Sequence, residues 1–286
     1  MEDNAITVED VSLLRRLLMA TCAKILGVLK RFILSLAILG TACVAFAQDN
    51  YEIQVYGSDT VKRGMTMFEL HSNYNLNGPS TTVNGVLPTR NALHETLEIT
   101  HGWTDNFETG FYIFTSYRED EGFNYVGSHF RPRVKVPDSW KWPVGASLSL
   151  EYGFEKRQFS EDTSDLEIRP IIDKQLGRWY LAFNPALEKT LAGGNPESQF
   201  IFSPNVKVSY DVTKVITFGV EYYGSVGPVN DWDTPPNQVH QIFPSIDLNL
   251  GESWEFNFGV GFGLNTESQD SQGTIIKMII GRRFSF

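Results

Sequence analysis

Residues 144–154 read VGASLSLEYGF, in which apolar or aromatic residues alternate with glycine, serine and glutamate. Because successive side chains of a β-strand point to opposite faces, this pattern predicts a strand with one apolar and one polar face. Residues 254–264, WEFNFGVGFGL, repeat the pattern. No stretch after residue 47 shows the 3.6-residue spacing of an amphipathic helix. The sequence therefore predicts an all-β protein.

The same alternation extends along the chain and predicts twelve strands, an even number. Six long connections, rich in Gly, Asn, Asp and Ser, alternate with connections that are mostly tight turns. The predicted strands are 64–76, 91–103, 107–118, 125–136, 143–154, 164–175, 178–189, 199–210, 215–225, 239–250, 254–264 and 274–286, and the long connections are roughly 77–90, 119–124, 155–163, 190–198, 226–238 and 265–273. Long loops at one rim and short turns at the other are typical of outer-membrane barrels. We predict a transmembrane antiparallel up-and-down β-barrel with long extracellular loops and short periplasmic turns.

The tryptophans give a second indication of a membrane protein. Five of the six fall at the predicted short-turn ends, and Trp232 lies in a long loop. The five are Trp103, Trp140, Trp142, Trp179 and Trp254. Tryptophan gathers at membrane–water interfaces, so this distribution predicts an aromatic girdle at one rim of the barrel.

The first part of the chain predicts export. An apolar run over 32–47 follows two basic residues and ends in Ala45-Phe46-Ala47, which is typical of a cleavable secretory signal. The alternatives are a permanent membrane anchor, for which the run is short, and a lipoprotein signal at Cys43. Whether translation starts at Met1 or Met19 stays open. The expected organisation, with both termini in the periplasm, is an N-terminal extension and cleavable signal over 1–47, a periplasmic N-terminal segment over 48–61 and the barrel over 62–286.

Charge and cysteine content exclude other classes of protein. The formal net charge is −10, which excludes a nucleic-acid binder that relies on basic charge. Cys22 and Cys43 both lie within 1–47, so the exported chain is expected to have no thiol, disulfide or cysteine-based metal site. We predict no cofactor and no metal site. The acidic stretches 119–121 and 231–233 are either solvated loop charge or bridges through Ca²⁺ or Mg²⁺ to lipopolysaccharide.

The polar face of the predicted strands lines the lumen and carries charges of both signs. Four consecutive inward positions of one strand are cationic: His129, Arg131, Arg133 and Lys135. The residues that we predict to line a constriction or solute path are Glu98, Tyr112, Arg131, Arg133, Arg169 and Asn184. Rings of charged and polar groups are how pores select solutes. The alternative is that these charges neutralise one another and plug a narrow barrel.

Five prolines lie on the apolar face of predicted strands, where they interrupt the pattern. They are Pro132, Pro170, Pro185, Pro204 and Pro244. Because proline cannot donate to a strand ladder, we expect a local β-bulge at each of them.

Several segments resemble known outer-membrane proteins. Residues 52–56 (EIQVY), 68–73 (FELHSN), 166–170 (LEIRP) and 179–184 (WYLAFN) resemble a family of transporter-like bacterial outer-membrane barrels grouped with the MetA pathway of phenol degradation. This resemblance covers essentially 48–286 and implies an outer-membrane barrel, without implying a substrate or any functional residue. The last strand, which ends at Phe286, resembles the C-terminal signature that the barrel-assembly machinery binds.

The predicted function is passive passage of small polar or amphipathic solutes through an outer-membrane channel, and not enzymatic catalysis. The expected partners are outer-membrane lipid, lipopolysaccharide and the barrel-assembly machinery. A second possibility is a non-conducting structural or surface-binding barrel. A third is an outer-membrane lipid hydrolase, which would need a Ser and His pair. His71 and Ser72 are adjacent on a predicted strand and therefore point to opposite faces.

Overall fold

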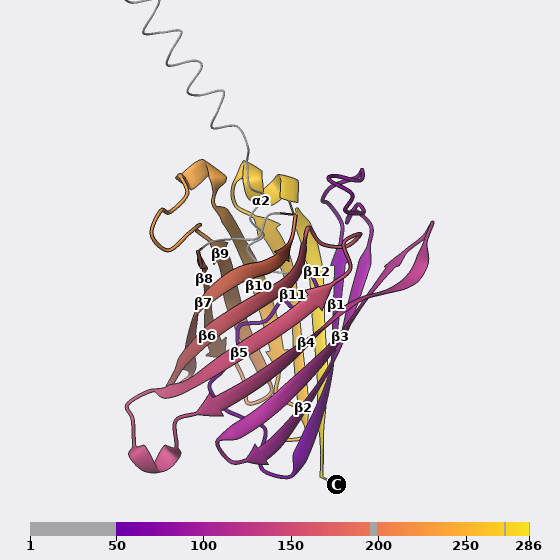
Figure 1. The fold of residues 1–286 in the computed structure, drawn as a ribbon. Coiled ribbons are helices and arrows are strands. Elements are labelled where there is room, and N and C mark those ends of the chain that lie inside the picture. The colour runs from indigo at the N-terminus through magenta and orange to yellow at the C-terminus, as the bar shows by residue number, and fades with distance from the viewer. Residues whose placement is uncertain (1–49, 195–198, 272, 286) are drawn as a thin grey trace, which may run out of the picture. The chain divides into compact units, whose positions relative to one another are not determined.

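The computed structural model describes residues 50–194, 199–271 and 273–285. The expected signal over 1–47 and the terminal Phe286 lie outside these residues. Within them the strands are β1 (Met65–Asn75), β2 (Leu93–Thr104), β3 (Phe107–Arg118), β4 (Gly122–Lys135), β5 (Gly145–Glu155), β6 (Asp162–Leu176), β7 (Trp179–Gly193), β8 (Ile201–Asp211), β9 (Ile216–Ser225), β10 (Val239–Leu248), β11 (Trp254–Gly263) and β12 (Thr274–Ser285). Each strand pairs antiparallel with its neighbours in the chain, and β12 pairs with β1 to close the barrel (Figure 1). The predicted antiparallel barrel of twelve strands is confirmed.

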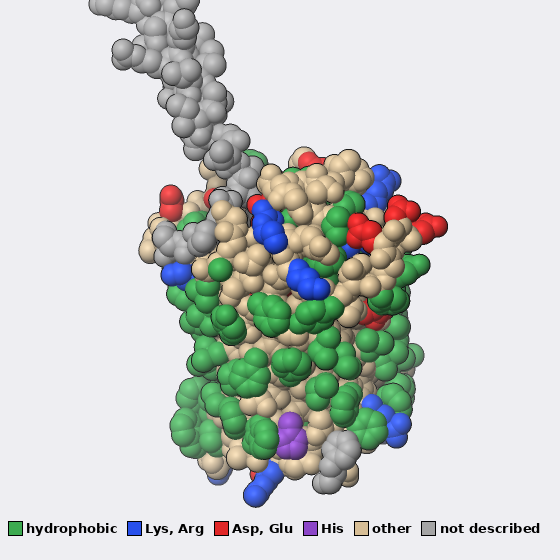
Figure 2. Space-filling view, turned by 45° about the vertical axis from the view of Figure 1, so that its right-hand side comes forward, with side chains coloured by type: hydrophobic (Ala, Val, Ile, Leu, Met, Phe, Trp, Pro, Cys, Tyr) green, Lys and Arg blue, Asp and Glu red, His purple; other side chains and the backbone are tan. Residues whose placement is uncertain are grey.

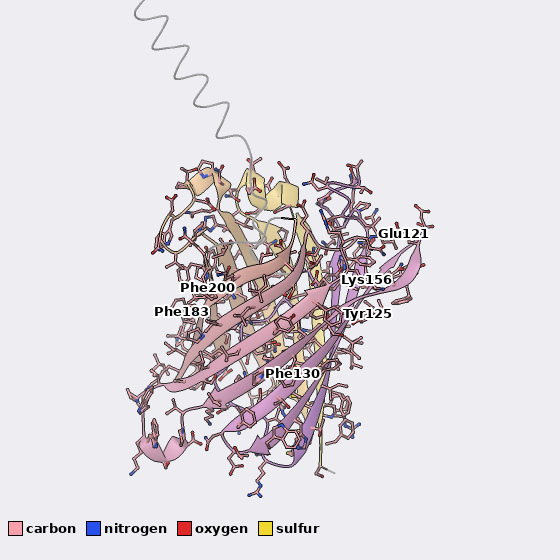
Figure 3. The ribbon with its side chains drawn as sticks, in the orientation of Figure 1. Glu121, Tyr125, Phe130, Lys156, Phe183 and Phe200 are labelled. Atoms are coloured by element: carbon pink, nitrogen blue, oxygen red, sulfur yellow. The ribbon has the colours of Figure 1, made fainter. Side chains whose placement is uncertain are left out.

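Burial in the barrel wall is the reverse of that in a soluble protein. On β5 the exposed side chains are Leu148, Leu150, Tyr152 and Phe154, and the buried ones are Ser147, Ser149 and Glu151. Figure 2 shows hydrophobic side chains covering the middle of the wall, with Lys, Arg, Asp and Glu toward the two ends. Phe130 on β4 and Phe183 on β7 belong to this outward-facing set (Figure 3). An apolar exterior with a polar interior is the arrangement that lipid outside the barrel favours.

The two rims differ in their connections, largely as predicted. At one rim the chain forms the long connections 76–92, 156–161, 194–200, 226–238 and 264–273. At the other rim most connections are tight turns, and the longest, 136–144, holds the short 3-10 helix η1 (Asp138–Trp140). The long loop predicted over 119–124 is wrong. Residues 122–125 instead continue the strand, and the hairpin turns tightly where Gly122 adopts a positive φ of 68°.

The β3–β4 hairpin therefore extends well beyond its neighbours at the long-loop rim (Figure 1). Glu121 lies at its tip, with Tyr125 and Lys156 nearer the wall (Figure 3). The exposed Phe123 ring packs against Tyr117 across the hairpin, with ring centroids 5.1 Å apart. This aromatic contact between neighbouring strands stabilises the extension.

Two short helical turns lie in the long connections. The 3-10 helix η2 (Pro235–Asn237) lies between β9 and β10, and α2 (Thr266–Ser271) lies between β11 and β12. The sequence analysis predicted neither. The amide of Ser268 donates to the side chain of Asn265 (3.0 Å), which is the capping interaction that short polar side chains provide at helix starts. Among the residues that the structure describes, no helix is long and apolar enough to cross a membrane.

The bulges predicted at the five prolines are wrong, because register passes each proline without a shift. Ile168 pairs with Leu187 and Ile172 with Phe183, so the register of β6 and β7 is the same on both sides of Pro170. Each proline is paired with a residue of one neighbouring strand, as Pro170 is with Leu148. On the side of the other neighbouring strand, the pairing is interrupted or begins at the proline. In an antiparallel sheet a residue exchanges hydrogen bonds with one neighbour only, so the missing N–H affects a single side.

Candidate functional site

Residues 50–61, called the inner segment below, run through the interior of the barrel. At the long-loop rim, Asn73 and Asn75 of β1 donate to the carbonyl and side-chain oxygens of Asn50 (2.9 and 3.0 Å). At the short-turn rim, the amide of Val61 donates to Glu108 (2.6 Å). The sequence analysis expected a periplasmic segment over 48–61. The structure corrects this for 50–61, which lie in the lumen, so the described chain begins at one rim and ends, on β12, at the other.

Side chains of the wall form hydrogen bonds with the backbone N–H and C=O groups of the inner segment. Asn184 accepts from the amide of Tyr56 (2.8 Å) and donates to its carbonyl (3.0 Å). Thr96 donates to the carbonyl of Tyr51 (2.6 Å), and Lys277 donates to that of Ile53 (3.1 Å). A buried backbone outside a ladder needs such partners. Polar residues that face the lumen thus act as hydrogen-bond partners of the inner segment.

The residues predicted to line a solute path gather around one residue of this segment, Tyr56, either in contact with it or through Arg131. All six are buried: Glu98, Tyr112, Arg131, Arg133, Arg169 and Asn184. The guanidinium carbons of Arg131, Arg169 and Arg133 lie 4.7, 5.1 and 5.6 Å from the centre of the Tyr56 ring. The hydroxyls of Tyr56 and Tyr112 are 3.2 Å apart. Cation–π contacts of this kind attract the three arginines to the ring.

Each arginine around Tyr56 also pairs with a carboxylate. Arg131 lies 2.6 Å from Glu98, Arg133 lies 2.6 Å from Glu108, and Arg169 lies 2.5 Å from Glu167. On the inner segment itself, Glu52 accepts the hydroxyl of Tyr56 and lies 3.9 Å from Arg169. We call this cluster, on β2 to β6, the arginine side. The structure brings the predicted residues together, and their role in solute passage stays a prediction.

A second cluster, called the lysine side, lies on β8 to β12. It consists of Lys207, Glu221, Tyr223, Asp247, Asn257 and Lys277. Lys277 pairs with Glu221, and Lys207 bridges Glu221 (3.3 Å) and Asp247 (2.8 Å). Asn257 donates to both carboxylates. Between this cluster and the inner segment lies a cavity of about 160 Å³, lined largely by polar groups.

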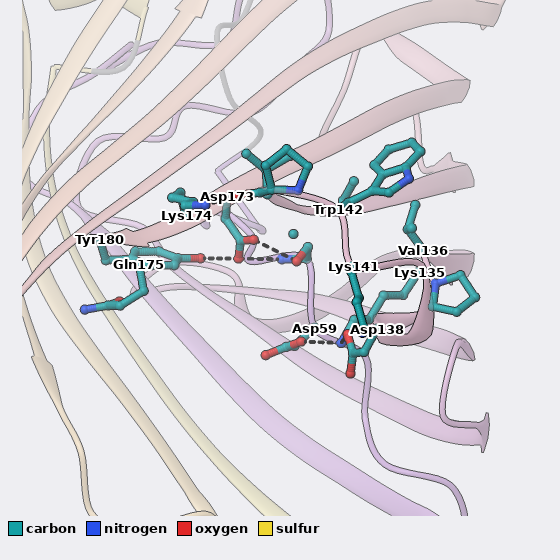
Figure 4. A pocket seen from close by; sticks show the side chains of 16 residues that line it. Asp59, Lys135, Val136, Asp138, Lys141, Trp142, Asp173, Lys174, Gln175 and Tyr180 are labelled. Carbon is teal, nitrogen blue, oxygen red and sulfur yellow. Dashed lines mark hydrogen bonds and ion pairs between the residues drawn. The ribbon is translucent and has the colours of Figure 1, made fainter. Parts of the chain in front are cut away.

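At the short-turn rim the inner segment borders a larger cavity of about 500 Å³ (Figure 4). Asp173 of β6 accepts from the amide and hydroxyl of Ser58 (3.0 and 2.7 Å) and from the hydroxyl of Tyr180 (2.8 Å). Lys135 lies 2.7 Å from Asp59. Beyond the mouth, the exposed Lys62 ammonium hydrogen-bonds to Glu252 and lowers the pKa of that carboxyl.

The five tryptophans of the predicted girdle all lie at the short-turn rim. Trp179 and Trp254 begin strands, Trp103 is at the end of β2, and Trp140 and Trp142 belong to the connection 136–144. All five are exposed. Their contact with lipid stays a prediction.

The Ser and His pair considered for a hydrolase does not come together. The His71 side chain is fully buried in the lumen. Ser72 faces outward and donates to Glu95 (2.8 Å). Because the two side chains lie on opposite faces of β1, His71 cannot activate the Ser72 hydroxyl.

Sequence reasoning did not single out Tyr56, the residue whose ring the three arginines contact. The signal was present in residues 51–56, where Tyr51, Ile53 and Val55 alternate with polar residues and then Tyr56 follows. The structure shows that this short apolar stretch packs inside the barrel and not in the membrane.

Comparison with known proteins supports the fold. No family model matches the chain, and no curated protein sequence matches it. Among solved structures, a COG4313 outer membrane channel from Pseudomonas putida F1 aligns with a TM-score of 0.57 and 12% identity, covering 82% of this chain and 100% of that one. The NanC porin aligns with a TM-score of 0.51 and 9% identity, covering 77% and 100%. At such low identity the likeness concerns the fold alone, and the chain has the fold of outer-membrane β-barrel channels.

Proposed function

We propose that the protein is an outer-membrane channel for passive passage of small polar or amphipathic solutes, and that the inner segment must move for solutes to pass. One observation carries the proposal. Residues 50–61 run along a polar lumen from one rim to the other and are held there by side-chain contacts to the wall. A barrel built only as a structural support has no need for a polar interior that a separate segment fills.

The way in which the segment is held supports movement. The barrel ladder closes through β1 and β12, and among the described residues no backbone–backbone hydrogen bond joins the inner segment to a strand. Leaving the lumen would therefore break side-chain contacts and leave strand pairing intact. Each net hydrogen bond contributes about 1 kcal/mol, so no single one of these bonds fixes the segment in the lumen. The cavities beside it, of about 160 and 500 Å³, already provide room for part of the movement.

The arginine side suggests which solutes are favoured. Once Tyr56 leaves, Arg131 and Arg169 present guanidinium groups to the lumen, and such groups bind carboxylates and phosphates in a bidentate manner. Their partners Glu98 and Glu167 keep part of this charge neutral. We therefore expect a mild preference for anionic or hydroxylated solutes.

Planar-bilayer recording tests the proposal. A variant that lacks residues 50–60 should conduct in larger and longer openings than the exported chain, because the lumen loses its filling. In that variant, Arg131→Ala should shift the reversal potential toward cation selectivity. Refolding of each variant is checked by heat-modifiable migration in gels.

A truncated barrel that folds and shows no conductance would instead support the non-conducting structural barrel. A phospholipid hydrolysis assay with added Ca²⁺ addresses the third possibility, and we expect no activity because His71 and Ser72 lie on opposite faces of the wall.

A further inference from the structure

We propose that Glu69, His71 and Glu98 form a binding site for one divalent transition-metal cation of the Zn²⁺ class, inside the barrel between β1 and β2. This inference does not depend on solute passage.

The strand geometry places the three side chains together. Glu69 and His71 are two residues apart on β1, so both point inward. Glu98 lies directly opposite Glu69 in the register of β1 and β2. One ligand atom from each residue lies within 4.8 Å of the other two, and all three residues are buried. Three groups can therefore meet one ion with little rearrangement of the backbone.

Four polar atoms of this cluster lack hydrogen-bond partners among the described residues. Oε1 of Glu69, both ring nitrogens of His71 and Oε2 of Glu98 are buried without a hydrogen bond. His71 Nε2 lies 3.4 Å from Glu98 Oε2, close enough for an ion pair but without hydrogen-bond geometry. Buried carboxylate and imidazole groups are normally satisfied, because an unpaired one is costly. One cation would give a partner to three of these atoms, one from each residue.

The charges around the cluster also favour a cation. Arg131 binds Oε1 of Glu98 at 2.6 Å, which leaves Oε2 turned to His71. Arg283 of β12 pairs with Glu255 at 3.0 Å. With neutral imidazole, the two carboxylates and Arg131 leave this cluster with a net negative charge, which attracts a cation. Arg131 would keep its bond to Glu98 and orient that ligand, as groups that hydrogen-bond to metal ligands do.

The donor set selects the class of ion. Imidazole nitrogen with carboxylate oxygens suits Zn²⁺ and neighbouring transition metals, whereas Ca²⁺ prefers six to eight oxygen ligands. Three protein ligands leave a further position for water. Opposite Glu69, β12 carries Gly281, and a Cβ there would lie 2.8 Å from Cγ of Glu69, so glycine leaves room for that ligand.

Metal titration of the refolded barrel tests the site. Because the cluster is buried, the protein is refolded from urea into detergent with Co²⁺ and then freed of excess metal. We expect about one bound equivalent, visible absorption bands of coordinated Co²⁺, and displacement by Zn²⁺ but not by Ca²⁺. Glu69→Gln and His71→Gln should each weaken binding by more than about 100-fold, since changes to outer groups alone reach 10–100-fold. The matched control is His94→Gln, a buried histidine on β2 that packs against Tyr51 and should leave binding unchanged.

Two results would overturn the proposal. One is the absence of a stoichiometric Co²⁺ or Zn²⁺ equivalent in a barrel that has folded by gel migration. The other is binding that survives both Glu69→Gln and His71→Gln. If His71→Gln does not fold, Glu69→Gln decides, because it replaces a carboxylate oxygen by an amide of the same shape. None of these readouts uses conductance, so they stand apart from the test of the proposed channel.

Discussion

The arginine side and the lysine side of the lumen both bury charges, but they treat the inner segment differently. On the arginine side, three guanidinium groups stack around the ring of Tyr56, a residue of the segment itself. On the lysine side, Lys207 and Lys277 pair with carboxylates of the wall, and Lys277 also donates to the carbonyl of Ile53 in the segment.

The difference follows from the chemistry of the two cations. A guanidinium is flat and can stack on an aromatic ring while its edges pair with a carboxylate, whereas an ammonium is a compact charge that takes its partners around one point. The arginine side therefore couples the segment to the wall. The lysine side couples wall strands to one another and leaves the cavity of about 160 Å³ beside the segment. Both clusters link wall strands, and the arginine side makes the more extensive contact with the segment.

The largest effect on folding is expected from the lysine side. Lys277 and Glu221 are both fully buried and form an ion pair. Lys277→Met should lower the free energy of unfolding by about 3–5 kcal/mol, because it leaves a buried carboxylate short of a partner. The double variant Lys277→Met with Glu221→Gln should recover part of that loss. Urea unfolding in lipid vesicles measures both, and a loss under about 1 kcal/mol for the single variant would show that this cluster does not support the wall.

A smaller effect on stability, but a larger one on the inner segment, is expected at Tyr56. Tyr56→Leu keeps apolar bulk and removes three cation–π contacts, so docking of the segment should weaken by about 1–3 kcal/mol. That corresponds to roughly a 5- to 150-fold rise in the undocked population. The measurement is the rate at which a thiol reagent modifies Val55→Cys, a buried position, in an exported chain expected to contain no other cysteine. Equal modification rates with and without Tyr56→Leu would contradict the claim that the arginine side holds the segment through Tyr56.

The smallest effect is expected at the rim. Lys62 and Glu252 pair at 2.9 Å but are both largely exposed. Exposed ion pairs contribute little, because water and salt screen them. Lys62→Ala should therefore change neither the urea midpoint nor the rate at which Val55→Cys is modified. A clearly faster modification would show that contacts at the short-turn rim also hold the inner segment in the lumen.

The barrel could be predicted from the sequence because lipid imposes a two-residue period on long stretches of wall, as in residues 144–154. The same period identified Arg131 and Asn184 as inward residues, which they are. It could not show what these residues contact. The inner segment is bound by side chains from strands far apart in the chain, and no local pattern encodes such contacts.

Two other features could not be predicted, for different reasons. The polar composition of residues 119–124 led to the prediction of a loop where the strand continues. Phe123 and Tyr125 pair across the hairpin, and the acidic residues form only its tip. For Glu69, His71 and Glu98, spacing along the chain gives two of the three residues, and the third depends on the register between β1 and β2. Register is set by closure of the whole barrel.

The central claim is that solutes pass only when the inner segment leaves the lumen. Ser58 Oγ lies 2.7 Å from Asp173 Oδ1, so Ser58→Cys and Asp173→Cys can be joined by a short, reducible thiol cross-linker. The measurement is single-channel conductance of this double variant before and after reduction. We predict that the joined protein stays closed and that reduction restores openings. Equal conductance in both states would contradict the account, because solutes would then pass with the segment in place.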